Sequence, residues 1–346
     1  MVFGISRKIN KFKEVFREKG LNSLFYIVDI YCTRLKDKIT YIKEYGLMFF
    51  CIKNKYLKDR AYNKYIDMIY DKLMEEFREL IDEYKNISYE TNGNINDYKN
   101  IWVCWWQGEK AMPELCHLCY LNLLNNTPID YTVHLITKYN YLNYVNIPQY
   151  IITKMEMGKI TLTQFSDILR QALLYSNGGI WLDASVWVTN NYMKNIDLSK
   201  KFWSVKLKNI DDREIWGQWI SDCKWSGFIL AAEKGNILNK FVYDGMCLHY
   251  KNHECVIDYF IQNFLIRIAY NNLLFAKALI NAIDYSNEYI YELEKLMNCI
   301  YEENKWNQII QNTGLFKLTQ KGEHFYQIEG KETFYGHIVD SMSQYT

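Results

Sequence analysis

The sequence predicts an α/β fold, in which helices flank a mostly parallel sheet and a helical region precedes it. From about residue 98 onward, short runs of β-branched and aromatic residues alternate with segments of helical periodicity, a pattern typical of parallel sheets with crossover helices. An apolar fraction of 49% over 346 residues is ample for a sizeable core, and only 3 Pro argue against a low-complexity chain. We place the boundary near residue 97, so that 1–97 form the helical region and 98–346 the α/β domain.

The first twenty residues predict a short basic amphipathic helix. Its apolar residues recur at helical spacing, and Gly20 follows as a stop signal: Ile5, Ile9, Phe12 and Phe16. The first 60 residues hold 14 Lys and Arg against 6 Asp and Glu. Two interpretations stay open, namely peripheral contact of residues 1–20 with an anionic membrane face and docking of the helix on its own domain.

Charge and hydropathy exclude several classes of protein. The formal net charge of +1 argues against nucleic acid as a partner. The chain begins without a secretory signal pattern and has no apolar run of the roughly 20 residues that span a bilayer. Nine cysteines form an odd count, typical of reduced thiols. We therefore expect a cytoplasmic protein, peripheral on the inner face of the cell membrane if residues 1–20 bind lipid.

The elements follow in a regular order. An apolar three/four spacing without Gly or Pro predicts one long helix over 56–85, and a polar loop follows it. Strands and helices are then predicted from the alternating pattern. The strands are expected at 101–106, 131–137, 179–188, 202–207 and 228–232, and the helices at 113–125, 161–176 and over much of 237–309.

The stretch 163–189, TQFSDILRQALLYSNGGIWLDASVWVT, is the most informative for function. Its helix leaves Asp167 and Arg170 off the apolar stripe as neighbours at i, i+3. A glycine turn leads into a buried strand that ends on Asp183, and ligands bind at the carboxyl ends of such strands. A carboxylate there can hold a divalent cation, and Arg170 can bind diphosphate or sugar oxygens. The alternative is an ordinary helix pair and a strand-end cap.

The runs SDILR and NGGIWLDAS resemble the signature of the capsular polysaccharide synthesis glycosyltransferases, relatives of the DxD-containing sugar transferases of glycosyltransferase family 32. Further blocks follow that family's order: WWQGEKAMPELC at 105–116, KWSGFILAAEKGN at 224–236, HECVIDYF at 253–260 and FKLTQK at 316–321. The resemblance implies a GT-A-type, Rossmann-like nucleotide-sugar domain with additional C-terminal helices. It implies transfer of a sugar from a nucleotide-diphosphate donor, UDP-linked by expectation, to a growing capsular or surface polysaccharide.

Carried over by position, the resemblance implies roles for donor-binding residues. Trp105 would stack on the donor base, and Asp167 and Arg170 would contact donor sugar and phosphate. Trp106 is the neighbouring candidate, and alternation along a strand predicts that only one of the two rings reaches the ligand. The alternative for Trp105 is plain core packing.

The resemblance also implies a metal site. Asp183 would be the first carboxylate of the DxD motif, whose third position here is Ser185. Mg²⁺ or Mn²⁺ prefers oxygen ligands and is often held by one or two carboxylates with substrate phosphates, so Asp183 and Ser185 are the predicted ligands. Without a metal, Lys317 or Lys321 could neutralise the leaving diphosphate. Either lysine could equally be a solvated surface charge.

Retention of anomeric configuration is the expected course, by a front-face displacement in which the departing phosphate accepts the acceptor's proton. Candidates for a protein base or nucleophile are Asp222, Asp258 and His253, and His253 is expected at a helix start. The alternative is that these residues are helix caps or surface groups.

The acceptor is expected to be lipid-linked or an oligosaccharide. Two other functions stay open: a protein-glycosylating effector, and a catalytically silent sugar-nucleotide or glycan-binding protein on the same fold.

Overall fold

The computed structural model describes residues 35–46, 59–90, 94, 98–208 and 220–343. The chain divides into two units, a smaller one of Met1–Met68 with His253–Ile257 and a larger one of Ile69–Asn252 with Asp258–Thr346. In the smaller unit, a helix over 35–46 is bound to the 253–257 segment, because the Tyr41 hydroxyl donates to the Ile257 carbonyl at 3.0 Å. The basic helix predicted for residues 1–20 lies outside the described residues, and the boundary near residue 97 stays a prediction.

The larger unit contains a five-stranded sheet with the order β2-β1-β3-β6-β5. Strands β2, β1 and β3 are parallel, whereas β6 pairs antiparallel with both β3 and β5. The sheet is therefore mixed, with one reversed strand in an otherwise parallel arrangement. Its strands are β1 Asn100–Cys104, β2 Thr132–Ile136, β3 Gly179–Leu182, β5 Phe202–Ser204 and β6 Ile229–Ala232.

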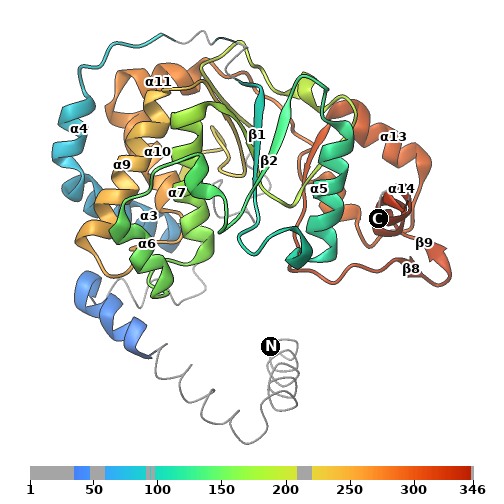
Figure 1. Cartoon of the computed structure of the whole chain (residues 1–346), viewed down its shortest axis with the longest axis horizontal. Helices are drawn as coiled ribbons and strands as arrows, with labels where there is room; N and C mark the ends of the chain where they lie inside the picture. The colour runs from blue at the N-terminus through green and yellow to red at the C-terminus, as the bar shows by residue number, and fades with distance from the viewer. Residues whose placement is uncertain (1–34, 47–58, 91–93, 95–97, 209–219, 344–346) are drawn as a thin grey trace, which may run out of the picture. The chain divides into compact units, whose positions relative to one another are not determined.

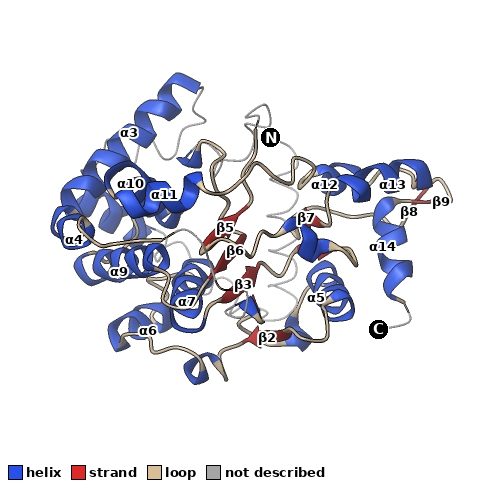
Figure 2. Ribbon diagram, turned by 90° about the horizontal axis from the view of Figure 1, so that it is seen from above, coloured by secondary structure: helices blue, strands red, loops and turns tan. Residues whose placement is uncertain are grey.

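Helices cover both faces of this sheet (Figures 1 and 2). Helices α6, α7, α9, α10 and α11 lie on one side, where α7 packs against α9 and against the central strands, and α5 lies on the other side. The helices are α5 Glu114–Asn126, α6 Gln149–Glu156, α7 Leu162–Asn177, α9 Ile237–Asn252, α10 Ile261–Asn272 and α11 Leu274–Asn281. The predicted α/β class, with its alternation of strand and helix, is confirmed.

The single helix predicted over 56–85 is interrupted. The structure has α3 Asp59–Glu76 and α4 Arg78–Tyr84, with Phe77 in a turn between them. The interruption is a one-residue distortion, because the Phe77 N–H still donates to the Leu73 carbonyl at 2.9 Å and the Ile81 N–H to the Phe77 carbonyl at 2.8 Å. Periodicity alone did not reveal the break because it contains neither Gly nor Pro.

The single strand predicted over 179–188 is also divided. Gly179–Leu182 (β3) belongs to the main sheet, but Val186–Val188 (β4) pairs antiparallel with β7, Leu315–Lys317. Asp183 to Ser185 form the turn between them, closed by a 2.9 Å hydrogen bond from the Val186 N–H to the Asp183 carbonyl. The sequence 179–188 is apolar on both sides of this turn because both strands are buried.

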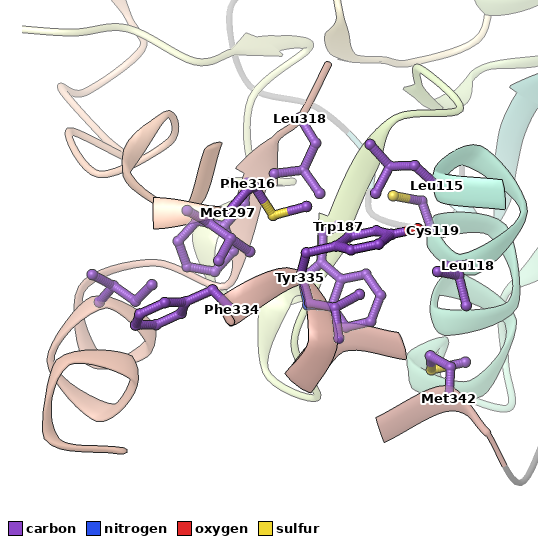
Figure 3. Packing of buried hydrophobic residues seen from close by; sticks show 13 residues of the cluster. Leu115, Leu118, Cys119, Trp187, Met297, Phe316, Leu318, Phe334, Tyr335 and Met342 are labelled. Atoms are coloured by element: carbon purple, nitrogen blue, oxygen red, sulfur yellow. The ribbon is translucent and has the colours of Figure 1, made fainter. Parts of the chain in front are cut away.

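A second apolar cluster, here the C-terminal core, lies behind β4 and β7 (Figure 3). It joins Leu115, Leu118 and Cys119 of α5 to Trp187 of β4 and Phe316 of β7. Helices α12 Glu292–Leu296, α13 Glu303–Asn312 and α14 Phe334–Met342 also contribute to it. The short strands β8 Gln327–Ile328 and β9 Lys331–Glu332 pair with each other before α14. This core fixes β7 against β4 and so fixes the position of Lys317.

The predicted glycine turn after α7 is confirmed. Gly178 is the C-cap, with φ of 68°, and its N–H donates to the Leu174 carbonyl at 2.9 Å. Gly179 follows with φ of 113°, and a Cβ there would lie 2.4 Å from the Asn100 carbonyl oxygen. Only glycine fits this backbone. The turn therefore brings β3 close to β1 and directs the chain toward Asp183.

Within the described part of the chain, the helices all fall short of the length and hydropathy needed to cross a bilayer.

Candidate active site

A cavity of about 760 Å³ opens beside the carboxyl ends of β1 and β3, entirely within the larger unit. Cys104 ends β1 and Asp183 follows β3, and both line the cavity. The α7 helix contributes Asp167 and Arg170 to its wall, and β7 contributes Lys317. The volume lies within the range of small-ligand sites, and such sites lie at the carboxyl ends of strands in α/β sheets.

Asp183 lies at the centre of a compact charged cluster. Its Oδ1 accepts hydrogen bonds from Arg170 Nη2 and from Trp181 Nε1, both at 2.9 Å. Its Oδ2 accepts one from Lys317 Nζ at 3.1 Å. Arg170 Nη1 also lies 2.8 Å from Asp167 Oδ1. Two carboxylates and two cations are thus joined by direct contacts at the edge of one cavity.

Burial and charge act in opposite directions on the two carboxyl groups. Burial raises the pKa of Asp167 to about 6, although Arg170 opposes the rise. Burial also acts to raise the pKa of Asp183, but Lys317 and Arg170 together outweigh it, so that this pKa lies below its ordinary value. Asp183 is therefore the carboxylate that stays ionised under all ordinary conditions.

Arg170 is held rigidly from behind. It is only 5% exposed, and its Nη1 donates to Gln262 Oε1 at 3.1 Å. Gln171 Nε2 donates to the same oxygen at 3.0 Å. A Cβ at Gly227 would lie 2.7 Å from the Gln262 amide and 3.4 Å from Arg170 Nη1, so the backbone there must pass close to both side chains. The guanidinium is consequently preorganised toward the cavity.

Both tryptophans of the WWQGEK block line the cavity, and the expectation that only one of the two rings reaches a ligand stays a prediction. Strand β1 ends at Cys104, and side-chain alternation does not extend past that residue. Trp105 Nε1 donates to the Ala111 carbonyl at 3.1 Å. Trp106 packs against Tyr141 and Phe165, with ring centroids 5.1 Å away in each case.

Two cysteines line the cavity but are poor nucleophiles. Burial raises the pKa of Cys104 to about 12 and that of Cys116 to about 11. Both are therefore neutral thiols at neutral pH, and a thiolate nucleophile is not available from them.

The cavity brings together most of the residues singled out from the sequence. Its lining includes Trp105, Asp167, Arg170, Asp183, Ser185, Lys317 and Lys321. Their roles in binding or catalysis stay predictions, but their convergence from four separate segments of sequence is a structural fact. Lys321 differs from Lys317 in being exposed.

The three candidates for a protein base lie elsewhere than in the cavity lining. Asp222 is in a turn with φ of 46°, where it pairs with Lys224 at 3.2 Å. Asp258 Oδ1 accepts the Phe260 N–H at 2.8 Å in the turn that precedes α10. His253 follows the end of α9 rather than starting a helix, and in the smaller unit its Nδ1 lies 3.7 Å from Glu44 Oε2.

Sequence reasoning missed several cavity residues. Gln262 and Asn263 interrupt the apolar run IQNFLIRIAY with two amides, and this interruption was the available signal. Both are buried and line the cavity. Tyr259 also lines it and is 45% exposed. It lies in the HECVIDYF block, but one more tyrosine among 30 carries no signal of its own.

The metal ligands predicted at Asp183 and Ser185 can be compared with the contacts of their oxygens. Lys317 Nζ donates to Ser185 Oγ at 2.8 Å as well as to Asp183 Oδ2. Asp183 Oδ1 already accepts two hydrogen bonds. A divalent ion takes several oxygen ligands. Here the Lys317 ammonium lies between the two oxygens that are predicted as ligands, those of Asp183 and Ser185. The residues present do not fit a divalent ion there.

A different pair of metal-ligating side chains lies outside the cavity lining. His249 Nδ1 is 2.9 Å from Glu76 Oε2, and the histidine is fully buried. Both residues belong to the larger unit. A histidine nitrogen and a carboxylate are ordinary ligands of transition metals, so this pair is a possible part of a metal site.

A cavity at strand ends, lined by cations and aromatic rings, is typical of enzymes that bind anionic, ring-containing ligands. The chain belongs to the capsular polysaccharide synthesis protein family, whose model matches residues 50–338. It is also similar to the O-glycosyltransferase braB of Annulohypoxylon truncatum, with 28% identity over 103 residues. That match covers 28% of this chain and 24% of the fungal protein, so the chain spans about a quarter of that relative's length.

Proposed function

We propose that this protein is a glycosyltransferase with a GT-A-type domain, which transfers a sugar from a UDP-sugar to a growing capsular or surface polysaccharide. The observation that carries the proposal is the convergence of Arg170, Lys317 and the two indoles on one cavity. Cations suit a diphosphate, and an aromatic ring suits a base. Membership of the family and the similarity to an O-glycosyltransferase support the same reaction.

Trp105 is the proposed platform for the nucleobase. Trp106 is engaged by two other aromatic rings, whereas Trp105 is held through its indole N–H. Stacking of a base on an aromatic ring contributes about 1 to 3 kcal/mol. Arg170 and Asp167, which line the same cavity, are the proposed contacts of the donor phosphate and sugar.

The proposed reaction proceeds with retention of configuration. The bond between the anomeric carbon and the β-phosphate oxygen breaks, and its electron pair stays on the phosphate. An acceptor hydroxyl bonds to the same carbon from the same face, and its proton passes to the departing phosphate. No protein base is required, and the protein's own contribution is positioning and charge stabilisation.

The acceptor is proposed to be a lipid-linked or oligosaccharide glycan. Contact of residues 1–20 with an anionic membrane face would keep the protein at the surface that carries a lipid-linked acceptor. The Mn²⁺ or Mg²⁺ expected at Asp183 and Ser185 is not part of this proposal, because the Lys317 ammonium lies between their oxygens.

The direct test is release of UDP from a panel of UDP-sugars by the purified full chain, with Trp105→Ala as the variant. We expect turnover of at least one donor, and an affinity for UDP that falls about 5- to 150-fold in Trp105→Ala. Tyr139→Ala is the matched control, because Tyr139 is 79% exposed and does not line the cavity. UDP binding without any turnover would favour a silent binding protein, and neither binding nor turnover would refute the proposal.

A further inference from the structure

The Lys317 ammonium occupies the position that an Asp-Ala-Ser motif would offer to a cation. It donates to Asp183 Oδ2 at 3.1 Å and to Ser185 Oγ at 2.8 Å. Its side chain is 23% exposed, and it lines the cavity. One positive charge is therefore already bound between the two oxygens, supplied by the chain itself.

The fold determines this position. Strand β7 pairs with β4 in a register that places Lys317 opposite Val186, directly after Ser185. The Lys317 N–H donates to the Ile290 carbonyl at 2.7 Å, and the Leu318 N–H donates to the Ser185 carbonyl at 2.9 Å. The backbone on both sides of the lysine is thus bound, and the C-terminal core packs behind it. The backbone that carries Lys317 is therefore fixed beside Ser185.

The two other carboxylates near the motif each have one oxygen in a polar contact. Asp167 is paired with Arg170 at 2.8 Å, and Glu294 accepts the Thr319 N–H at 2.8 Å. A divalent ion at Asp183 would have to displace Lys317 and would then lie beside the Arg170 guanidinium. Like charges at such short range repel strongly inside a protein. The site therefore favours the binding of an anion at Lys317 and Arg170, and it disfavours the binding of a third cation between them.

We propose that Lys317 takes the place of the divalent cation, so that this cavity binds and activates a nucleoside-diphosphate sugar without metal. The inference rests on the proposed glycosyl transfer. As the bond from the anomeric carbon to the β-phosphate oxygen breaks, charge accumulates on the diphosphate. The Lys317 ammonium and the Arg170 guanidinium stabilise that charge, and the acceptor's proton completes the leaving group.

The test is calorimetric titration of UDP into the full chain after chelation of divalent ions. We expect the wild type to bind UDP in metal-free buffer, and added Mn²⁺ to change the affinity by less than about threefold. Lys317→Met keeps a long unbranched side chain at this position but removes the ammonium, which lies 5.4 Å from the centroid of the Phe228 ring. It should weaken metal-free binding at least tenfold, while Lys317→Arg restores most of it.

Two controls separate charge from folding. Lys305→Met makes the same change at an exposed lysine of α13 that does not line the cavity and should bind UDP as the wild type does. Thermal midpoints of all variants report whether each one folds, and Lys317→Arg keeps the proposal testable if Lys317→Met does not.

Release of UDP from UDP-sugars is then measured with chelator and with Mn²⁺. Equal rates in both support the proposal. Binding and turnover that appear only with Mn²⁺, in the wild type and in Lys317→Met alike, would overturn it and leave the glycosyltransferase function standing. A chain that neither binds UDP nor turns over any UDP-sugar in either buffer would refute the proposed function, and the inference with it.

Discussion

Replacement of Asp183 by alanine should both abolish transfer and destabilise the larger unit. The carboxylate accepts hydrogen bonds from Arg170, Lys317 and Trp181. Its loss leaves the buried Arg170 guanidinium with Asp167 and Gln262 alone. A carboxylate in an open cleft would cost little on removal, but this one neutralises a guanidinium whose side chain is only 6% exposed.

The size of the effect follows from burial. Removing one partner of a fully buried ion pair costs about 3 to 5 kcal/mol. The Asp183 side chain is 28% exposed and that of Arg170 6%, so solvent screens the pair in part and we expect roughly 2 to 3 kcal/mol. For a unit of this size that corresponds to a fall of roughly 3 to 6 °C in the thermal midpoint.

Thermal and urea unfolding of the two proteins, followed by circular dichroism, measure this difference. Asp183→Asn keeps an oxygen for Arg170 and Trp181 and should lose clearly less stability, though its activity should also fall. Asp130→Ala is the matched control, because Asp130 forms an exposed pair with Lys99 and such pairs contribute under about 1 kcal/mol. A midpoint for Asp183→Ala within 1 °C of that control would refute the ion-pair reasoning.

Two further predictions concern the turn and the buried acid. Gly179→Ala places a Cβ 2.4 Å from the Asn100 carbonyl oxygen at φ of 113°, and it should lower the free energy of unfolding, measured in urea, by about 2 to 5 kcal/mol. Gly158→Ala is the control, because open space surrounds that position, and it should cost about 1 kcal/mol. Equal losses in the two variants would contradict the steric argument. The raised pKa of Asp167, about 6, means that the folded state holds its proton more tightly than the unfolded state. The free energy of unfolding should therefore fall by up to about 3 kcal/mol as pH rises from 4 to 6. Asp167→Asn should remove this slope, and a slope unchanged in that variant would contradict it.

Local pattern carried much of the fold. Helical spacing located α5 and α7 within a residue or two, and β-branched and aromatic runs located β1 and β2. The local sequence pattern did not predict element boundaries that no nearby residue marks. The apolar run after Gly179 gave no sign that its two halves enter different sheets, because burial on both sides makes them equally apolar.

Within the candidate site, the sequence by itself determined the segment that runs from α7 through the glycine turn to Asp183. These residues are close in sequence, and helix geometry with a tight turn sets their spacing. The i, i+3 contact of Asp167 with Arg170 and the placing of Asp183 at a strand end both follow from that local geometry.

Only the tertiary structure decided what surrounds Asp183. The pairing of β4 with β7 places Lys317 against it across 134 positions of sequence, and α10 sets Gln262 behind Arg170 across 92. Register between distant strands depends on the packing of the whole C-terminal core, to which each residue contributes weakly. No short stretch of sequence contains all of these contributions, so the partners of a buried charge are determined by the fold as a whole.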